Sequence, residues 1–228
     1  MSIADNLLKY KKELEGEDVE LIAVSKFNDN EAILEAYHAG QRIFGENIVQ
    51  ELTEKQEALP KDIAWHLIGH LQTNKVKYIA PFISLIQSVD SIKLLGEINK
   101  QAAKNKRVID CLLQIYIADE DTKFGLDHAE LIELLRSEEY ADMKNIRIVG
   151  LMGIATNNAP EKQTKDEFQE LKVLFDGIKV SFFRKEDSFK ELSMGMSGDY
   201  KLAIEEGSTM VRIGSSIFGQ RKIKHYKA

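Results

Sequence analysis

Apolar residues recur along the chain in two alternating patterns. Short, nearly continuous apolar runs, typical of buried strands, begin near eight positions: Glu20, Arg42, Ala64, Ser84, Val108, Arg147, Lys190 and Thr209. Between these runs the apolar residues take helical spacing, as in the two sets Leu94, Leu95, Ile98, Ala102 and Phe168, Leu171, Phe175, Ile178. Strand and helix therefore alternate from one end of the chain to the other.

This alternation predicts the fold class. Eight strands, each followed by a helix, are the count of an α/β protein of the (β/α)₈ TIM-barrel type, and right-handed crossovers make closure natural. A doubly wound open sheet is the alternative. An amphipathic segment ahead of the first strand, with Ile3, Leu7, Tyr10 and Leu14 on one side, predicts an extra N-terminal helix. The chain has three prolines and no Gly/Ser-rich linker, so we expect residues 1–228 to form a single domain.

Capping residues support the predicted helix boundaries. Asn28 and Asp127 each precede a glutamate by three positions, and Ser91 follows an aspartate at the end of an apolar run. These are signatures of helix starts. The segment NNAPEKQTKDE, residues 157–167, has the composition of a flexible loop between a strand and the next helix.

Composition narrows the function classes. The 228 residues are 43% hydrophobic and 30% charged, and the net charge is −6. An acidic balance spread along the chain argues against nucleic acid or an anionic membrane as the main partner. No stretch has the length and apolarity of a membrane span, and the N-terminus does not resemble a signal peptide, so we expect a cytoplasmic protein. Helices with mixed surface charge favour a monomer.

Two residue types that often carry chemistry are interpreted as structural. The single cysteine, Cys111, lies in the apolar run VIDCLLQIYI and is expected to be a buried core thiol. His66 and His70 are four residues apart, but a strand-like segment and Gly69 break the helical geometry that a metal pair would need. We therefore expect no metal site, and we expect His38 and His128 to be exposed on helices.

Lys26 stands at the end of the first strand, separated from the apolar residues 21–24 only by Ser25. In a TIM barrel the active site gathers at the C-terminal ends of the strands, so Lys26 would point into the mouth. Partial desolvation and a nearby cation would lower the pKa of its amine, and a neutral amine can form a Schiff base with an aldehyde. The alternative is a strand-end lysine that reaches solvent or pairs with a carboxylate.

The last two strands are followed by small, glycine-containing turns, SMGMSGD and RIGSSIFG. Barrels commonly hold a phosphate between these loops, on backbone N–H groups at a short helix N-terminus. Ser197, Gly198, Gly214 and Ser215 would supply small side chains, hydroxyls and close backbone approach. Tight turns with serine caps are the alternative interpretation of either loop alone.

Arg212 lies between two apolar residues near the end of the eighth strand. Alternate residues of a barrel strand face the interior, so its guanidinium can face the mouth. There it would give a ligand nitrogen a donor and keep that nitrogen unprotonated. The alternative is an ion pair with a strand-end carboxylate such as Glu46.

Five motifs, in order over nearly the whole chain, resemble the pyridoxal phosphate homeostasis protein family, the YggS/PROSC type, which is related in fold to the barrel domain of alanine racemase. The last motif is long and specific, whereas the short ones would be weak alone. The motifs are AVSK (23–26), FGENIVQE (44–51), WHLIGHLQTNK (65–75), GLMGIAT (150–156) and LSMGMSGDYKLAIEEGSTMVRIGSSIFG (192–219).

The resemblance implies a cofactor, pyridoxal 5′-phosphate (PLP), and a role for each matching residue. Lys26 would hold the cofactor as an internal aldimine, Asn47 would lie beside the ring, and Met152 would help to wall the pocket. Arg212 would approach the pyridine nitrogen. The phosphate would be held by Ser193, Ser197, Gly214 and Ser215. The chain departs from the family at "FND" after the lysine, which leaves the shape of that loop open, and at Ser215, where a threonine is frequent.

The resemblance also implies intracellular PLP homeostasis or delivery, with apo PLP-dependent enzymes as the expected recipients, and without strong catalytic turnover. A racemase of this fold adds a second domain, and the sequence ends nine residues after Gly219. An arginine at the pyridine nitrogen also makes the ring a poorer electron sink. Two alternatives stay open: a small PLP-dependent racemase or lyase, and a barrel that binds a phosphate ligand non-covalently with Lys26 as an electrostatic clamp.

Overall fold

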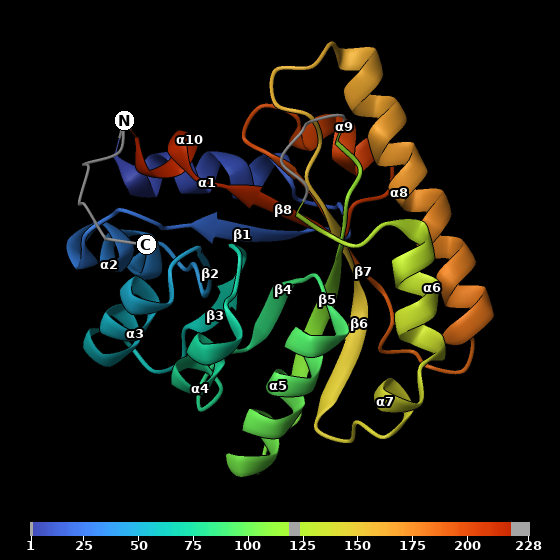
Figure 1. The fold of residues 1–228 in the computed structure, drawn as a ribbon. Helices are drawn as coiled ribbons and strands as arrows, with labels where there is room; N and C mark the ends of the chain where they lie inside the picture. Colours follow the sequence, from blue (N-terminus) through green and yellow to red (C-terminus); the bar gives the residue numbers. More distant parts are fainter. Residues whose placement is uncertain (1, 119–123, 220–228) are drawn as a thin grey trace.

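The computed structural model describes residues 2–118 and 124–219 and contains a closed parallel barrel (Figure 1). Its eight strands follow one another in sequence order, and β8 pairs with β1 to close the barrel. This confirms the (β/α)₈ prediction and overturns the open-sheet alternative. The strands are β1 (Glu20–Val24), β2 (Ile43–Glu46), β3 (Ala64–Leu67), β4 (Leu85–Val89), β5 (Ile109–Ile115), β6 (Ile146–Gly153), β7 (Glu191–Met196) and β8 (Met210–Ile213).

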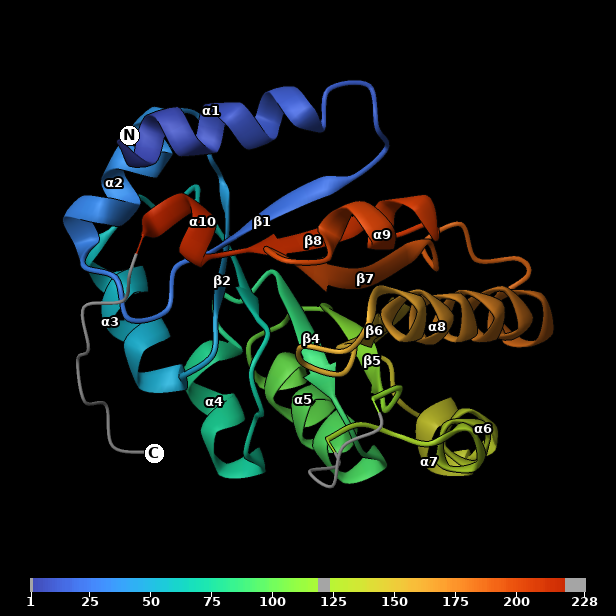
Figure 2. The same cartoon turned by 90° about the horizontal axis from the view of Figure 1, so that it is seen from above.

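Helices surround the barrel, and the predicted extra helix α1 lies on the outside near α2 and α10 (Figures 1 and 2). The helices are α1 (Ile3–Glu13), α2 (Asn30–His38), α3 (Val49–Ala58), α4 (Val76–Ile79), α5 (Ile92–Lys104), α6 (His128–Arg136), α7 (Glu138–Ala141), α8 (Glu161–Phe182), α9 (Tyr200–Glu205) and α10 (Ser215–Phe218), with a 3₁₀ turn at Thr73–Lys75. The apolar residues at helical spacing in α5 and α8 are buried, as expected.

Capping chemistry follows the sequence with one exception. Asp127 forms a capping box at the start of α6, and Ser91 caps α5. The cap of α2 is Asp29 and not Asn28: the Asp29 carboxylate accepts from the backbone N–H of Ala32. Asn28 instead donates its side-chain amide to the carbonyl of Lys26, so it stabilises the turn before the helix.

The flexible-loop prediction for residues 157–167 is wrong over most of its length. Helix α8 begins at Glu161, directly after Pro160, so only the first four residues of the segment precede the helix. A proline that supplies the residue before the first helical turn is compatible with a helix start. Residues 161–167 are all polar, which is typical of a loop, but Thr164 and Glu167 are buried in the helix.

Two apolar layers stabilise the fold. The larger one lies between the strands and the surrounding helices. A smaller one fills the barrel interior and consists of Ile22, Leu85, Leu112, Val149, Met152 and Met210. The interior is therefore a packed core with no open channel, as is usual for this fold. Ligands can enter only at the ends of the barrel.

Candidate functional site

Four predicted site residues lie at the C-terminal ends of neighbouring strands. Ser197 follows β7, Gly214 follows β8, Lys26 follows β1 and Asn47 follows β2. Because the barrel closes between β8 and β1, these four strands form one continuous arc. The closed topology therefore brings together the first and last quarters of the sequence.

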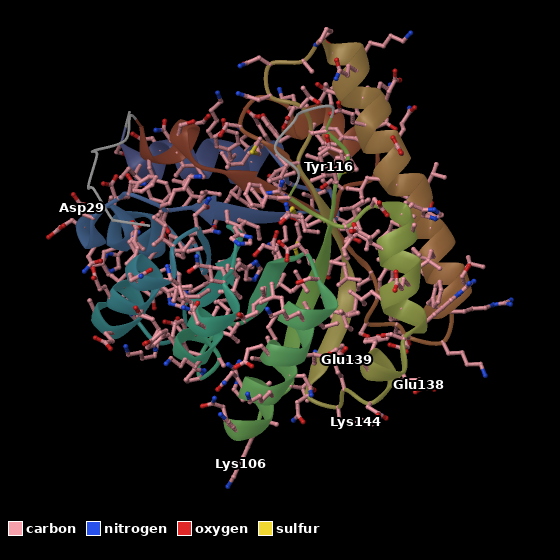
Figure 3. All side chains as sticks on the ribbon, viewed as in Figure 1. Asp29, Lys106, Tyr116, Glu138, Glu139 and Lys144 are labelled. Atoms are coloured by element: carbon pink, nitrogen blue, oxygen red, sulfur yellow. The ribbon has the colours of Figure 1, made fainter. Side chains whose placement is uncertain are left out.

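Figure 3 locates this end of the barrel. Tyr116, just after β5, lies on the opposite side of the molecule from Lys106 and Lys144, which precede β5 and β6. All strands are parallel, so the site residues share the end marked by Tyr116.

The loops after β7 and β8 are in direct contact. The backbone N–H of Gly214 donates to the hydroxyl of Ser197 at 3.3 Å. A Cβ atom at position 214 would lie only 3.2 Å from both the Cβ and the carbonyl oxygen of Val24, so a larger residue would require this loop or the end of β1 to shift. Ser215 begins α10 and is exposed. Hydroxyls and backbone N–H groups of this kind suit a phosphate.

Lys26 is partly buried and lies on a strained turn. The next residue, Phe27, has φ of 64°, in the left-handed region that a bulky side chain rarely adopts. The backbone N–H of Phe27 donates to Glu51 at 2.6 Å, and the amide of Asn28 donates to the Lys26 carbonyl at 3.2 Å. The unusual loop sequence after the lysine is thus held by polar contacts, and Glu51 is a site residue that the sequence analysis missed.

Arg212 is buried inside the barrel among neutral partners. Its guanidinium donates to the hydroxyl of Ser193 at 2.6 Å and to the carbonyl of Gly153 at 2.9 Å. Burial lowers the pKa of Arg212 to about 10, which leaves the group charged at neutral pH. The alternative pairing of Arg212 with Glu46 is wrong, because Glu46 bonds instead to Ser25 and Lys55.

Ser193 lies inside a strand, unlike the other residues that the resemblance implied for the phosphate. The residue lies within β7, is fully buried, and its hydroxyl is held between Arg212 and Gln87. Its hydroxyl therefore contacts Arg212 inside the barrel, whereas Ser197 and Gly214 lie in the loops beyond the strands.

The polar contacts of Arg212 continue through the barrel. Arginine can only donate, so the Ser193 hydroxyl accepts from it and donates onward to Gln87 Oε1 at 2.7 Å. The Gln87 amide nitrogen then lies 3.1 Å from Nδ1 of His66, which must accept. This order fixes the proton of His66 on Nε2. Complete burial lowers the pKa of His66 to about 3, so the imidazole is neutral.

The two histidines considered as a metal pair have different surroundings. His66 belongs to the barrel interior, whereas His70 is half-exposed with Nδ1 3.3 Å from an oxygen of Asp90. No cluster of three or more His, Cys, Asp or Glu residues suited to a metal ion occurs within residues 2–118 and 124–219. His38 and His128 are exposed on helices, as predicted.

Asn47 lines a pocket of about 370 Å³ at the mouth of the barrel. The side-chain oxygen Oδ1 of Asn47 is buried and has no hydrogen-bond partner among the described residues, an arrangement that costs free energy unless a ligand donates to it. Met152 lies in the apolar interior layer, paired in register with Ser193. The other residues that line the pocket are Ile68, Gly69, His70, Gln114, Ile115, Tyr116, Ile117, Ala118, Phe124, Ile154, Ala155, Asn157 and Met196.

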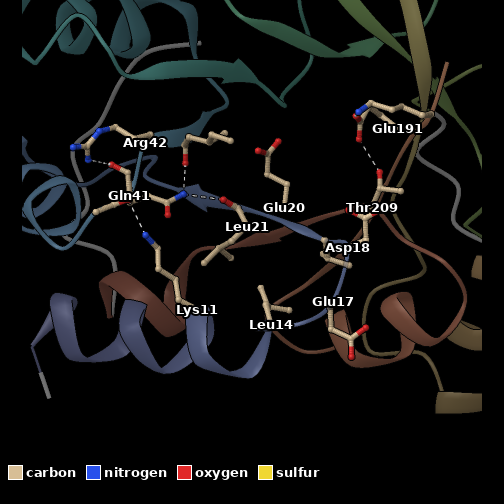
Figure 4. Close-up of a pocket in the computed structure, with 14 residues that line it drawn as sticks. Lys11, Leu14, Glu17, Asp18, Glu20, Leu21, Gln41, Arg42, Glu191 and Thr209 are labelled. Atoms are coloured by element: carbon tan, nitrogen blue, oxygen red, sulfur yellow. Dashed lines mark hydrogen bonds and ion pairs between the residues drawn. The ribbon is translucent and has the colours of Figure 1, made fainter. Parts of the chain in front are cut away.

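A larger cavity, about 630 Å³, lies at the opposite end of the barrel (Figure 4). Its polar groups largely satisfy one another: Lys11 donates to the carbonyl of Gly40, Gln41 bridges two backbone carbonyls, and Thr209 donates to Glu191. Cations and carboxylates are mixed along its wall. Size alone would favour this cavity, but the buried arginine and the small-residue loops lie at the other end.

Cys111 is a buried free thiol, as predicted. Burial raises the pKa of the thiol, which makes it a poor nucleophile. No helix in the described part of the chain has both the length and the apolarity to cross a membrane.

Comparison with known proteins decides the family. Residues 1–222 match the family described as alanine racemase, N-terminal domain. The chain is 41% identical to a protein of Aquifex aeolicus over 203 residues, 89% of this chain and 87% of that one, and that protein is named pyridoxal phosphate homeostasis protein. The chain belongs to the pyridoxal phosphate homeostasis protein family. An Escherichia coli K12 member is 39% identical over 212 residues, 90% of this chain and 87% of that protein.

Two solved structures show the same barrel fold. PipY from Synechococcus elongatus PCC7942, solved with PLP bound, has a TM-score of 0.85 and 36% identity, covering 96% of this chain and all of that one. Alanine racemase from Bartonella henselae, with covalently bound pyridoxal phosphate, has a TM-score of 0.66 at 14% identity and covers 98% of this chain and 62% of that one. The second likeness shows a shared fold only.

Proposed function

We propose that this protein binds PLP as a Schiff base on Lys26 and acts in intracellular PLP homeostasis and delivery, without strong turnover of amino acids. The proposal takes residues 1–228 as one cytoplasmic, monomeric, PLP-binding domain that hands the cofactor to apo PLP-dependent enzymes. The observation that carries it is the arc of strand ends around the barrel mouth, which combines an amine, a buried cation and a two-loop cradle for an anion.

The residues fit the cofactor's three polar groups. Gly214 and Ser197 already meet across the two loops, with Ser215 beside them, and can turn their N–H and hydroxyl groups to a phosphate. The unsatisfied oxygen of Asn47 can accept a hydrogen bond at the mouth. Arg212 supplies a buried positive charge whose described hydrogen bonds go to neutral groups, so an anionic ligand gains from binding near it.

The covalent step needs only the Lys26 amine and the cofactor aldehyde. The neutral amine attacks the aldehyde carbon, a C–N double bond replaces the C–O double bond, and one water leaves. The bound cofactor supplies an electrophilic imine and a conjugated ring that can accept electrons.

The same arginine argues against the racemase or lyase alternative. A pyridine nitrogen that accepts from a guanidinium stays unprotonated, and an unprotonated ring stabilises a carbanion less well. Ser193 and Gly153, the hydrogen-bond partners of Arg212, are both neutral groups that leave its charge intact. The names of the 39–41% identical relatives support homeostasis over catalysis.

Borohydride reduction of the PLP-loaded protein tests the proposal. We expect one reduced phosphopyridoxyl group, mapped by peptide mass spectrometry to Lys26, and none in K26A. Modification of Lys11 in the opposite cavity would overturn the assignment, and a bound but irreducible cofactor would support the non-covalent alternative. Racemisation assays across amino acids, with K26A as control, then test for turnover. Cofactor transfer is measured by reactivation of an apo PLP-dependent enzyme, with free PLP at the same concentration as reference.

A further inference from the structure

A buried ion cluster lies directly behind the turn that carries Lys26. Lys55 on α3 donates to Glu46 Oε1 at 2.7 Å and to Glu51 Oε1 at 2.7 Å. All three side chains are nearly inaccessible to solvent, with exposed fractions of 5%, 0% and 1% respectively. We name Glu46, Glu51 and Lys55 the Lys55 cluster.

The Lys55 cluster binds the backbone on both sides of Lys26. Lys55 donates to the carbonyl of Ser25 at 2.8 Å, and the Ser25 hydroxyl donates to Glu46 at 2.6 Å. On the other side the N–H of Phe27 donates to Glu51 at 2.6 Å. The peptide units that flank Lys26 are therefore both tied to a single buried network.

The tie to Phe27 has a specific conformational consequence. Phe27 adopts φ of 64°, a conformation that its side chain opposes, and such a residue persists only where its surroundings over-determine it. The hydrogen bond from its N–H to Glu51 is a direct restraint on that peptide. Without it the peptide between Lys26 and Phe27 can rotate toward the extended region, and the Cα–Cβ direction of Lys26 changes with it.

Stability alone does not account for the Lys55 cluster. Three buried ionisable groups are costly to desolvate, and an apolar replacement of similar volume is commonly as stable. Two carboxylate oxygens, Oε2 of Glu46 and Oε2 of Glu51, also lack a partner among the described residues. The contacts that do form converge on the peptides next to Lys26 and on Glu46, the residue before Asn47.

We propose that Glu51 is a positioning residue for Lys26, with Lys55 holding its carboxylate in place. The inference rests on the proposed Schiff base, because it concerns how the same amine is aimed at the cofactor. The length of the Glu51 side chain determines how well Lys26 is positioned, because Glu51 acts through the hydrogen bond to Phe27. Its charge is needed only to secure Lys55.

Two conservative variants distinguish the effect of side-chain length from the effect of charge. E51D keeps the carboxylate but is one methylene too short to hold both Lys55 and Phe27, whereas E51Q keeps the length and an acceptor oxygen. The rate of Schiff-base formation with PLP, followed by visible absorbance, is expected to fall about tenfold or more in E51D and less than about threefold in E51Q. Glu57 is exposed on the same helix, so E57Q is the matched control.

A second substitution tests the conformational step. Glycine adopts positive φ without steric cost, so F27G in the E51D background is expected to recover a large part of the lost rate. A loss of α3 packing would not be repaired by a change at position 27. Urea unfolding of each variant without PLP shows that the rates compare folded proteins.

The outcomes distinguish the inference from the proposed function. If wild-type protein gives no borohydride-reducible product at Lys26, the proposed function fails. If wild type reacts and E51D reacts equally fast, only the positioning role of Glu51 is refuted. A slower E51Q than E51D would also refute it, because charge and not reach would then govern the amine. Failure of F27G to recover any rate in E51D would remove the conformational step.

Discussion

The buried imidazole of His66 predicts how acid destabilises the barrel. Burial lowers its pKa from 6.5 to about 3, so the folded protein keeps this ring neutral while an unfolded chain protonates it below about pH 6.5. Its contribution to stability is therefore fully present above about pH 6.5 and is lost as pH falls toward about 3. One pKa unit corresponds to about 1.4 kcal/mol, so between about pH 7.5 and pH 5.0 the loss is about 2 kcal/mol.

The variant H66N isolates this term. Asparagine cannot titrate, and its side-chain oxygen can still accept from Gln87, which lies 3.1 Å from Nδ1 of His66. Any void that the smaller side chain leaves costs about the same at each pH. Urea unfolding followed by circular dichroism at the two pH values should therefore show the wild-type advantage over H66N shrinking by about 2 kcal/mol on acidification. An advantage that stays constant would refute a neutral, buried His66. H128N, on an exposed helical position, is the control for a histidine change as such.

Three further predictions concern the mouth of the barrel. G214A places a Cβ 3.2 Å from Val24, so we expect weaker PLP binding by fluorescence titration and a stability loss of about 1 kcal/mol, unlike G177A, whose Cβ would meet open space. R212M removes a buried charge, so its unfolding free energy without PLP should equal or exceed that of wild type, while the stabilisation by added PLP in thermal unfolding is lost. Burial raises the pKa of Glu46 from 4.5 to about 7. Its contribution to stability is therefore present below about pH 4.5 and is lost as pH rises through about 7. The unfolding free energy of wild type relative to E46Q should fall by up to about 3 kcal/mol on that rise.

The barrel could be predicted from the sequence because its signals are local and repeated. Each strand is a short apolar run, and each long helix shows a buried stripe at helical spacing. The ends of β1, β7 and β8 could also be identified, because a lysine after an apolar run and glycine-serine turns are visible without a structure. Closure of the sheet then places these ends side by side by topology alone.

The supporting contacts could not be predicted, since they depend on which distant side chains face one another. Glu51 and Lys55 are spaced i, i+4 on a helix, which in a sequence indicates an ordinary surface ion pair. Their burial, and the approach of Glu51 to Phe27, follow only from how α3 packs behind the first strand. Gln87 likewise lies in an apolar run, and nothing in the sequence tells that it connects Ser193 to His66.

The two buried networks contact different residues of the site, a difference that the resemblance did not indicate. The Lys55 cluster holds the backbone on both sides of Lys26. The chain from Arg212 through Ser193 to His66 is neutral beyond the guanidinium, so no carboxylate within it hydrogen-bonds to Arg212, and the Asp199 carboxylate acts on that charge only electrostatically. A carboxylate in place of Ser193 would pair with Arg212, satisfy it in the absence of ligand and weaken its pull on the cofactor. The neutrality of this chain is therefore what leaves the arginine available, and S193D should bind PLP more weakly even where its barrel is more stable.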